Sequence, residues 1–224
     1  MGDVIGELLP TAIGVAISPV PMIAVILMLL APRAKAASVG FLLGWVVGTA
    51  AVVTVAAVLV DPVDDSTASA PSTFSSVLKL LLGAVAVLLG VRNWRSRPRD
   101  GQTPELPKWM AAIDTMTPVK ATGLGLLLSG VNPKNLTLGL AGGLVIGAGD
   151  LNSGETAVAV AVFVVIASSS IAVPVLGYLF AQDRVRQPLD ELRVWLTHNN
   201  STVMAVLLLV IGVTILGKGL EGLF

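Results

Sequence analysis

At residues 129–135 the chain reads Ser129-Gly130-Val131-Asn132-Pro133-Lys134-Asn135, in the middle of an apolar segment over residues 117–148. Pro133 cannot donate a backbone hydrogen bond, and it disfavours helical geometry at Asn132 before it. The same pair is typical of a helix start, with Asn132 as N-cap and Pro133 as the first helical residue. We therefore expect two half-helices here, which meet near the middle of the membrane.

The first apolar segment carries a matching interruption, Ser18-Pro19-Val20-Pro21. We expect Pro19 and Pro21 to shape this break and Ser18 to contribute its hydroxyl to a site. Two interrupted hydrophobic segments in corresponding positions are the best sequence pointer to the binding site of a transporter.

The composition is that of an integral membrane protein. Of the 224 residues, 54% are hydrophobic and 12% are charged, whereas a soluble domain has about 25% charged residues. The chain has no cysteine, which excludes disulfides and thiolate nucleophiles. It also lacks the motifs of a phosphate-binding loop, a zinc site or a nucleophile elbow. We expect no enzymatic activity, no cofactor, no bound metal and no nucleic-acid partner.

Six apolar segments are long enough to cross the membrane, since a spanning helix needs about 20 residues. The sequence therefore predicts an all-α, polytopic membrane protein in which the first and fourth helices are broken. The predicted segments are 4–31, 38–60, 75–93, 117–148, 155–180 and 201–223.

The longest connection, residues 94–116, divides the chain into two sets of three segments, in residues 1–93 and 117–224. A shift of 112 residues places Pro21 on Pro133. Because three spans are an odd number, the second set re-enters from the opposite side, which gives an inverted repeat. We expect one transmembrane domain over residues 1–224, with residues 94–116 as a cytoplasmic linker.

Basic residues gather in three loops, over residues 31–37, 92–120 and 181–200, whereas carboxylates dominate the other ends of the segments. Cytoplasmic loops carry an excess of Lys and Arg. We therefore expect these three loops inside the cell and both termini outside.

Lys134 is the most informative single residue. A charged side chain at mid-bilayer costs about 2.5–3.5 kcal/mol even on lenient insertion scales, and no Asp or Glu lies at a comparable depth in any segment. One interpretation is a water-filled cavity in which Lys134 and a half-helix N-terminus hold an anionic substrate group. The alternative is that Lys134 caps the C-terminal carbonyls of the other broken helix and is purely structural.

Further polar residues are candidates for substrate binding. Asn132 and Asn135 offer amide donors and acceptors, although Asn132 is equally suited to be only an N-cap. Ser168 and Ser169 precede Pro174 in the fifth segment, where serines also serve to pack membrane helices together.

The two motifs at 18–21 and 130–135, with six predicted spans, resemble the LysE-type exporter superfamily. Within it, the chain is most similar to the actinobacterial GAP family of glycolipid- and sulfolipid-addressing proteins. The resemblance implies movement of cell-envelope lipids or glycolipids across the bacterial inner membrane. Other branches export amino acids or metal ions, and the lack of intramembrane acids argues against the metal-ion branch. The motif residues correspond to Pro19, Pro21, Asn132, Pro133 and Lys134.

Three hypotheses follow. The first is an exporter of a polar or anionic lipid that works by alternating access around Lys134, with the bilayer and the lipid as partners and homo-oligomers allowed. The second is an exporter of amino acids or other small solutes, which needs no lateral opening to the lipid. The third is a non-transporting scaffold for envelope lipid synthesis, in which the midplane is dry and Lys134 is paired internally.

Overall fold

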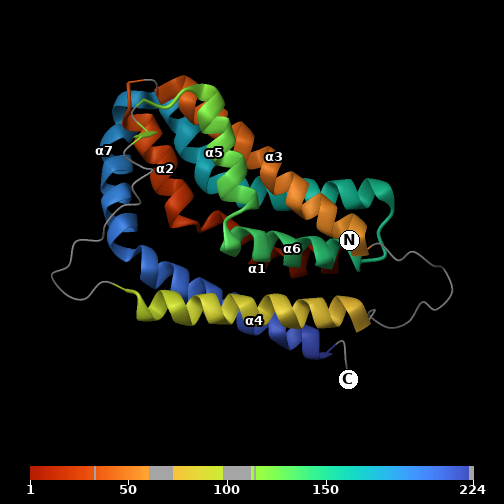
Figure 1. Cartoon of the computed structure of the whole chain (residues 1–224). Helices are drawn as coiled ribbons and strands as arrows, with labels where there is room; N and C mark the ends of the chain where they lie inside the picture. Colours follow the sequence, from red (N-terminus) through yellow and green to blue (C-terminus); the bar gives the residue numbers. More distant parts are fainter. Residues whose placement is uncertain (33, 61–72, 98–111, 114, 222–224) are drawn as a thin grey trace.

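The structure is a computed structural model that describes residues 1–32, 34–60, 73–97, 112–113 and 115–221. Its regular elements are helices, as the sequence predicts (Figure 1). In chain order they are α1 (Gly2–Ala16), α2 (Pro19–Leu30), α3 (Ala34–Val60), α4 (Thr73–Arg95), α5 (Pro118–Gly130), α6 (Pro133–Gly147) and α7 (Ser153–Glu221).

Among the described residues, three helical stretches are long and apolar enough to cross a membrane: Ala34–Leu59, Ser76–Arg95 and Ser153–Glu221. The bent pair α1 and α2 would make a fourth. The helices α5 and α6 have 13 and 15 residues, fewer than the roughly 20 that one span needs. The structure thus supports a helical membrane protein with three or four candidate spans, and the six-span inverted repeat stays a prediction.

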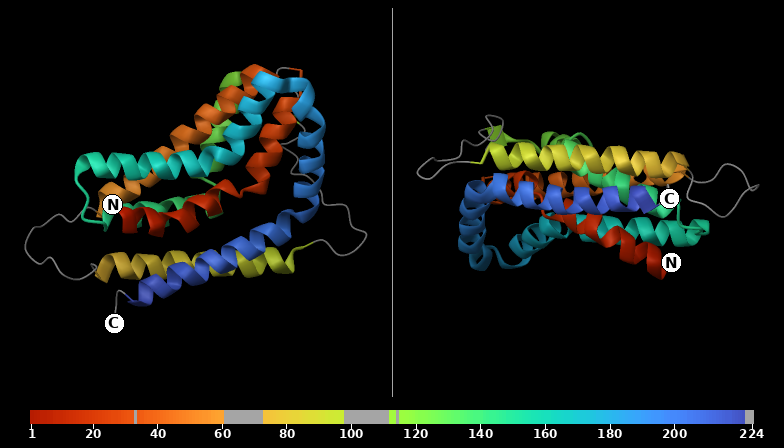
Figure 2. Two further views of the ribbon diagram at one scale, coloured as in Figure 1. Left: turned by 180° about the vertical axis from the view of Figure 1, so that it is seen from behind. Right: turned by 90° about the horizontal axis from the view of Figure 1, so that it is seen from below.

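The predicted fifth segment and the described part of the sixth both lie in α7, which is one helix of 69 residues. It is not straight. Ala181 has non-helical angles, φ −145° and ψ 49°, and Pro174 and Pro188 lie on either side of it. Figure 2 shows α7 rising, reversing direction and then descending to run beside α4. The local break at Ala181 therefore replaces the loop that the sequence predicts over residues 181–200.

Helices α3, α5 and α6 pack at backbone distance. A Cβ added at Gly44 would overlap the carbonyl of Thr122 in α5, and one added at Gly143 would lie 2.6 Å from the carbonyl oxygen of Val53. Small residues let membrane helices approach this closely. Phe41 and Trp45 stack one turn apart in the core, with ring centroids 6.4 Å apart.

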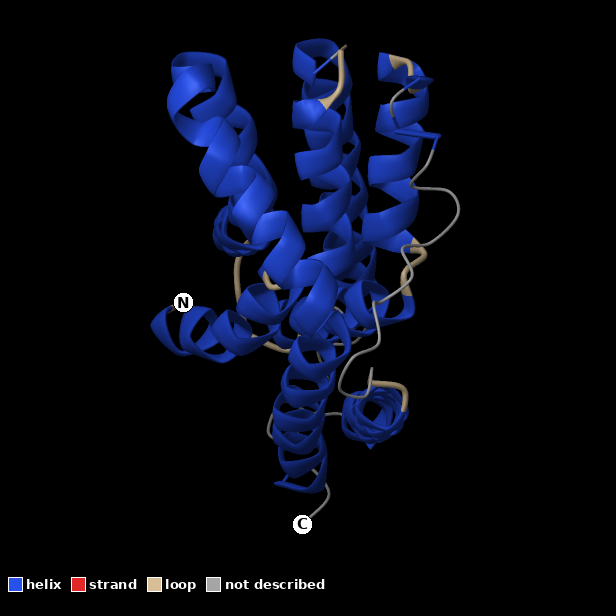
Figure 3. Cartoon of the chain, turned by 90° about the vertical axis from the view of Figure 1, so that its left-hand side faces the viewer, coloured by secondary structure: helices blue, strands red, loops and turns tan. Residues whose placement is uncertain are grey.

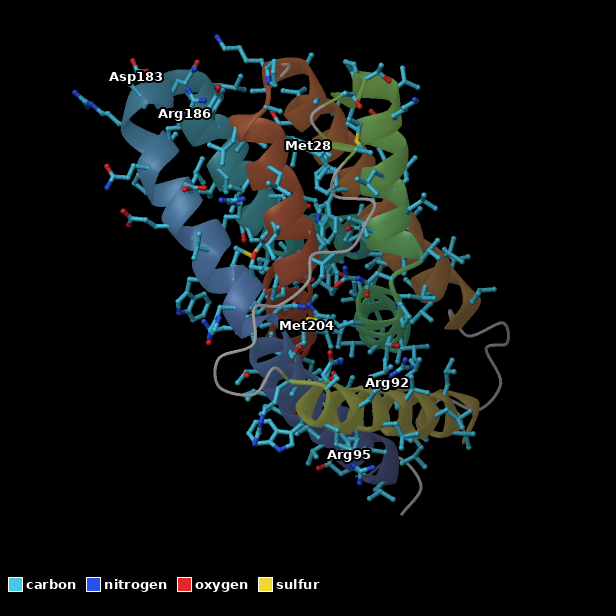
Figure 4. All side chains as sticks on the ribbon, turned by 60° about the vertical axis from the view of Figure 1, so that its left-hand side comes forward. Met28, Arg92, Arg95, Asp183, Arg186 and Met204 are labelled. Carbon is cyan, nitrogen blue, oxygen red and sulfur yellow. The ribbon has the colours of Figure 1, made fainter. Side chains whose placement is uncertain are left out.

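Three arginines of the predicted cytoplasmic loops lie toward one end of the molecule, as does Asp183. In Figure 1 the start of α1 and the end of α7 lie on the right, whereas the end of α4 and the turn of α7 at Ala181 lie on the left. Figure 4 labels Arg92 and Arg95 on α4, and Arg186 just after that turn. Most of the linker 94–116, together with Arg33, Arg99 and Lys108, lies outside the described residues.

Candidate functional site

The first predicted break is confirmed. α1 ends at Ala16 and α2 begins at Pro19, and the two helices are bent by 51°. Ser18, between them, has extended geometry, with φ −117° and ψ 94°. This geometry is expected before a proline, which then takes the first helical position because it needs no donor there.

The second predicted break is confirmed as well. α5 ends at Gly130 and α6 begins at Pro133. Asn132 is extended, and its Oδ1 accepts a hydrogen bond from the backbone N–H of Lys134 at 3.1 Å. Asn132 is therefore the N-cap of α6, which is the structural role that the sequence allowed for it.

Lys134 joins the two breaks. Its side chain comes from the first turn of α6 and is only 2% exposed. The ammonium Nζ donates to the carbonyl oxygen of Ile17 at 2.8 Å and to the hydroxyl of Ser18. The Ile17 carbonyl lies at the C-terminal end of α1, where the helix leaves acceptors unpaired and carries partial negative charge. A cation is therefore stabilised there.

Asn135 also bonds to both breaks, and we call the contacts among Ser18, Lys134 and Asn135 the junction. Its Oδ1 accepts from the Ser18 hydroxyl at 2.8 Å, and its Nδ2 donates to the carbonyl of Leu128 at 2.9 Å. Since Leu128 belongs to the last turn of α5, Asn135 links α5 and α6 to the start of α2. Ser18 accepts from Lys134 and donates to Asn135, which uses both capacities of a hydroxyl.

Lys134 has neutral partners only. Within the described residues, ion pairs join Lys218 to Glu7 and Arg193 to Asp190, and neither involves Lys134. The contact that the capping alternative required is present, and the substrate-binding interpretation of Lys134 stays a prediction. In this arrangement the junction is closed around Lys134.

The three consecutive serines of α7 point in different directions. Ser168 is 4% exposed, and its hydroxyl has no partner among the described residues. Ser169 is exposed and donates to Ile166 O of its own helix. Ser170 instead donates to the carbonyl of Ala16 at 2.6 Å, at the first break. Of the two serines singled out from the sequence, neither makes a hydrogen bond to the first break among the described residues, whereas their neighbour Ser170 does.

Among the described residues, four further polar atoms lie buried without a hydrogen-bond partner: Arg193 Nε and Asn200 Oδ1 of α7, and Trp45 Nε1 and Thr49 Oγ1, which share one helix, α3. Sequence reasoning did not single out the two residues of α3. The available signal was their spacing, since residues four apart lie on one face of a helix.

A small cavity of about 20 Å³, with room for about one water, lies where α1, α4, α6 and α7 meet. Charged groups at its edge include Glu7 and Lys218, whose Oε2 and Nζ are 3.3 Å apart, and Lys79. Lys134 does not line it. The complete lining is Glu7, Pro10, Thr11, Lys79, Ala141, Val145, Ile211, Thr214, Ile215 and Lys218.

Comparison with known families gives one match. The family model described as Sap, sulfolipid-1-addressing protein, matches residues 8–221 of this chain. No curated protein and no solved structure matches the chain. The matched range covers both helix breaks and the cavity-lining residues except Glu7.

Proposed function

This chain belongs to the sulfolipid-1-addressing protein family, and from that premise we propose that it carries a polar or anionic cell-envelope lipid or glycolipid across the bacterial inner membrane. The proposal assigns Lys134 as the group that the lipid headgroup engages. Membership of the family supports a lipid as the substrate. The hydrogen bonds between the two helix breaks support a movement of the half-helices during transport.

The carrying observation is a buried ammonium without a carboxylate partner. Lys134 Nζ is held by a backbone carbonyl and a hydroxyl. The bond from the Lys134 ammonium to the Ile17 carbonyl already has an ionised donor, and an anionic acceptor adds the attraction between two opposite full charges. An anionic headgroup that reaches Lys134 therefore competes well against the Ile17 carbonyl, and no carboxylate among the described residues has to be displaced first.

The proposed mechanism uses Lys134 as a latch. In the closed arrangement, Lys134 ties the start of α6 to the end of α1. When the headgroup binds the Lys134 ammonium, the hydrogen bond between Lys134 and the end of α1 breaks. The short non-helical segments at Ile17–Ser18 and Val131–Asn132 then act as hinges. A few residues at element ends are sufficient to absorb such a change of backbone angles. The half-helices then expose the junction to the opposite side of the membrane.

The energy source in this proposal is a gradient, a partner protein or passive exchange, because the sequence has no nucleotide-binding loop. The lipid chains would leave sideways between helices, so that only the headgroup crosses the protein. This route suits a small chain in which Lys134 is buried.

Purified protein in liposomes tests the proposal. Fluorescent anionic and zwitterionic lipids in one leaflet report transfer to the other, and labelled amino acids trapped inside report export of small solutes. We expect transfer of the anionic lipid above that of protein-free liposomes. Export of amino acids without lipid transfer would instead favour the small-solute exporter.

One observation favours a second candidate, the non-transporting scaffold for envelope lipid synthesis. Lys134 is paired within the chain and 2% exposed, as a purely structural lysine would be. A scaffold would transfer neither lipids nor amino acids in liposomes, and it would lose folded protein when Lys134 is replaced.

A further inference from the structure

The small cavity lies between two layers of helices, and we call this boundary between the layers the seam. Figure 3 shows α4 end-on beside the last part of α7, below the other helices. The cavity is lined by α4 and the last part of α7 on one side, and by α1 and α6 on the other. It therefore lies on the boundary at which these two layers meet.

The packing of α4 on α7 places two lysines at the same level. A Cβ added at Gly219 would lie 2.8 Å from Leu80 Cγ, and one added at Gly83 would lie 2.8 Å from Leu216 Cγ. The two helices thus run antiparallel in close contact. Lys79 and Lys218 each adjoin the contact between Leu80 and Gly219, and both line the cavity.

The charges at this seam do not balance. Lys218 pairs with Glu7 at 3.3 Å, with side chains that are 27% and 50% exposed. Lys79 forms no ion pair within the part of the chain that the structure describes. Among the described residues that line this cavity, two ammonium groups thus accompany one carboxylate, which pairs with Lys218, and Lys79 has no anionic partner.

The rest of the lining is apolar or already satisfied. Thr11 and Thr214 donate their hydroxyl hydrogens to Leu8 O and Val210 O of their own helices. Exposed apolar side chains lie on the outward faces of the same two helices, turned away from the lysines: Val77, Leu81 and Val213. An amphiphile with an anionic headgroup at the lysines would lay its acyl chains along these outward faces.

We propose that Lys79 and Lys218 hold the anionic headgroup of a membrane lipid at this seam, in a site distinct from Lys134, with Glu7 as the internal competitor. The cavity itself has room for about one water, so the headgroup lies at its mouth between the two ammonium groups and the acyl chains lie along α4 and α7. The inference depends on the proposed function in one respect only: it assumes that the lipid bound here is the lipid that the protein transports.

Binding of a fluorescent phosphatidylglycerol to the purified full chain in detergent tests this site, with phosphatidylcholine of the same acyl chains and free sulfate as competitors. We expect saturable binding that phosphatidylcholine and millimolar sulfate do not displace. Lys79→Gln and Lys218→Gln should each weaken it about fivefold, the upper range for a partly exposed ion pair. Glu7→Gln should tighten it about two- to fivefold because Lys218 then loses its competitor.

Lys120→Gln is the matched control, since this lysine is exposed on α5 and does not line the cavity. It should leave binding unchanged. Equal binding of both lipids, displacement by free sulfate, unchanged affinity in the two lysine variants or no gain in Glu7→Gln would each overturn the proposal.

The result is separable from that of the proposed function. If wild-type protein transfers lipids in liposomes but the seam variants bind phosphatidylglycerol as well as the wild type, only this inference fails. If the lysine-dependent binding is found but no lipid is transferred, the seam remains a lipid site and the transport proposal fails.

Discussion

At the scale of the residue, the junction is a set of polar side chains that satisfy broken backbone. Asn132 caps the start of α6, Asn135 reaches the last turn of α5, and Lys134 reaches the end of α1. A membrane interior leaves no water to satisfy such groups, so each unpaired one costs several kcal/mol. The motif therefore stabilises the breaks that its own proline creates.

Replacement of Lys134 separates the two roles of this side chain. Under the proposed function, Lys134→Met abolishes lipid transfer in liposomes, because the headgroup loses its cation, while the amount of folded protein stays near that of the wild type. Methionine is unbranched and only one atom shorter than lysine, and it removes the buried charge. Lys120→Met is the control, and both variants are measured for transfer and for yield.

Loss of folded protein in Lys134→Met alone would favour the purely structural role. Unchanged transfer would contradict the latch.

Asn135→Ala should lower stability. It leaves the Leu128 carbonyl without its donor and the Ser18 hydroxyl without its acceptor. A buried group left unsatisfied costs about 1–3 kcal/mol, so the unfolding temperature in detergent should fall clearly. Asn199→Ala is the matched control, because the amide of Asn199 is exposed and bonds only to Trp195 O of its own helix. Equal unfolding temperatures of the two variants would count against the junction.

At the scale of the element, prolines decide where the helices begin. Pro19, Pro118 and Pro133 each occupy the first helical position of their helix. The missing N–H costs nothing at that position, and the residue before it is held in extended geometry. By contrast, Pro174 and Pro188 lie within α7, and the departure from helical angles is at Ala181 between them.

Pro133→Ala should weaken the second break without changing any charge. Alanine restores the N–H and has the highest helix propensity, so α5 and α6 are freer to join as one helix. We expect slower lipid transfer and near-normal yield, both measured in the same liposomes. Pro118→Ala is the control, since Pro118 starts α5 in the same way but lies away from both breaks. If transfer by Pro133→Ala matched that of Pro118→Ala, the hinge would have no role.

At the scale of the whole molecule, the breaks allow residues far apart in sequence to meet. The bonds between Lys134 and the first break span 116 and 117 residues of chain. The last part of α7 lies beside α4, and the two termini of the described chain lie toward the same end in Figures 1 and 2. This arrangement is compatible with termini on one side of the membrane.

The absence of cysteine makes the orientation directly testable. Single variants Asp3→Cys, Asp150→Cys and Ser96→Cys can each be treated in intact cells with a maleimide that does not cross membranes. Since basic loops face the cytoplasm, we expect labelling at positions 3 and 150, and labelling at position 96 only after the cells are opened. Labelling of all three in intact cells would contradict the orientation.

Both helix breaks could be predicted from sequence because their cause is local. A proline acts on its own residue and on the one before it, whatever surrounds them, so Ser18 and Asn132 are extended as expected. The helical class follows equally from apolar runs that must satisfy their own backbone in lipid. The number of spans stays a prediction, because the described helices give three or four candidate spans and the half-helices α5 and α6 are each too short to count as one.

The sequence by itself determined that the chain is a helical membrane protein with two interrupted segments and one lysine at the second interruption. Only the tertiary structure decided what that lysine touches, because its partners at Ile17 and Ser18 are brought to it by the folding of other helices. The same holds for Ser170 rather than Ser169 at the first break, and for Lys79 beside Lys218. Adjacent residues on a helix differ by about 100° in direction, so only packing selects which one faces a neighbour.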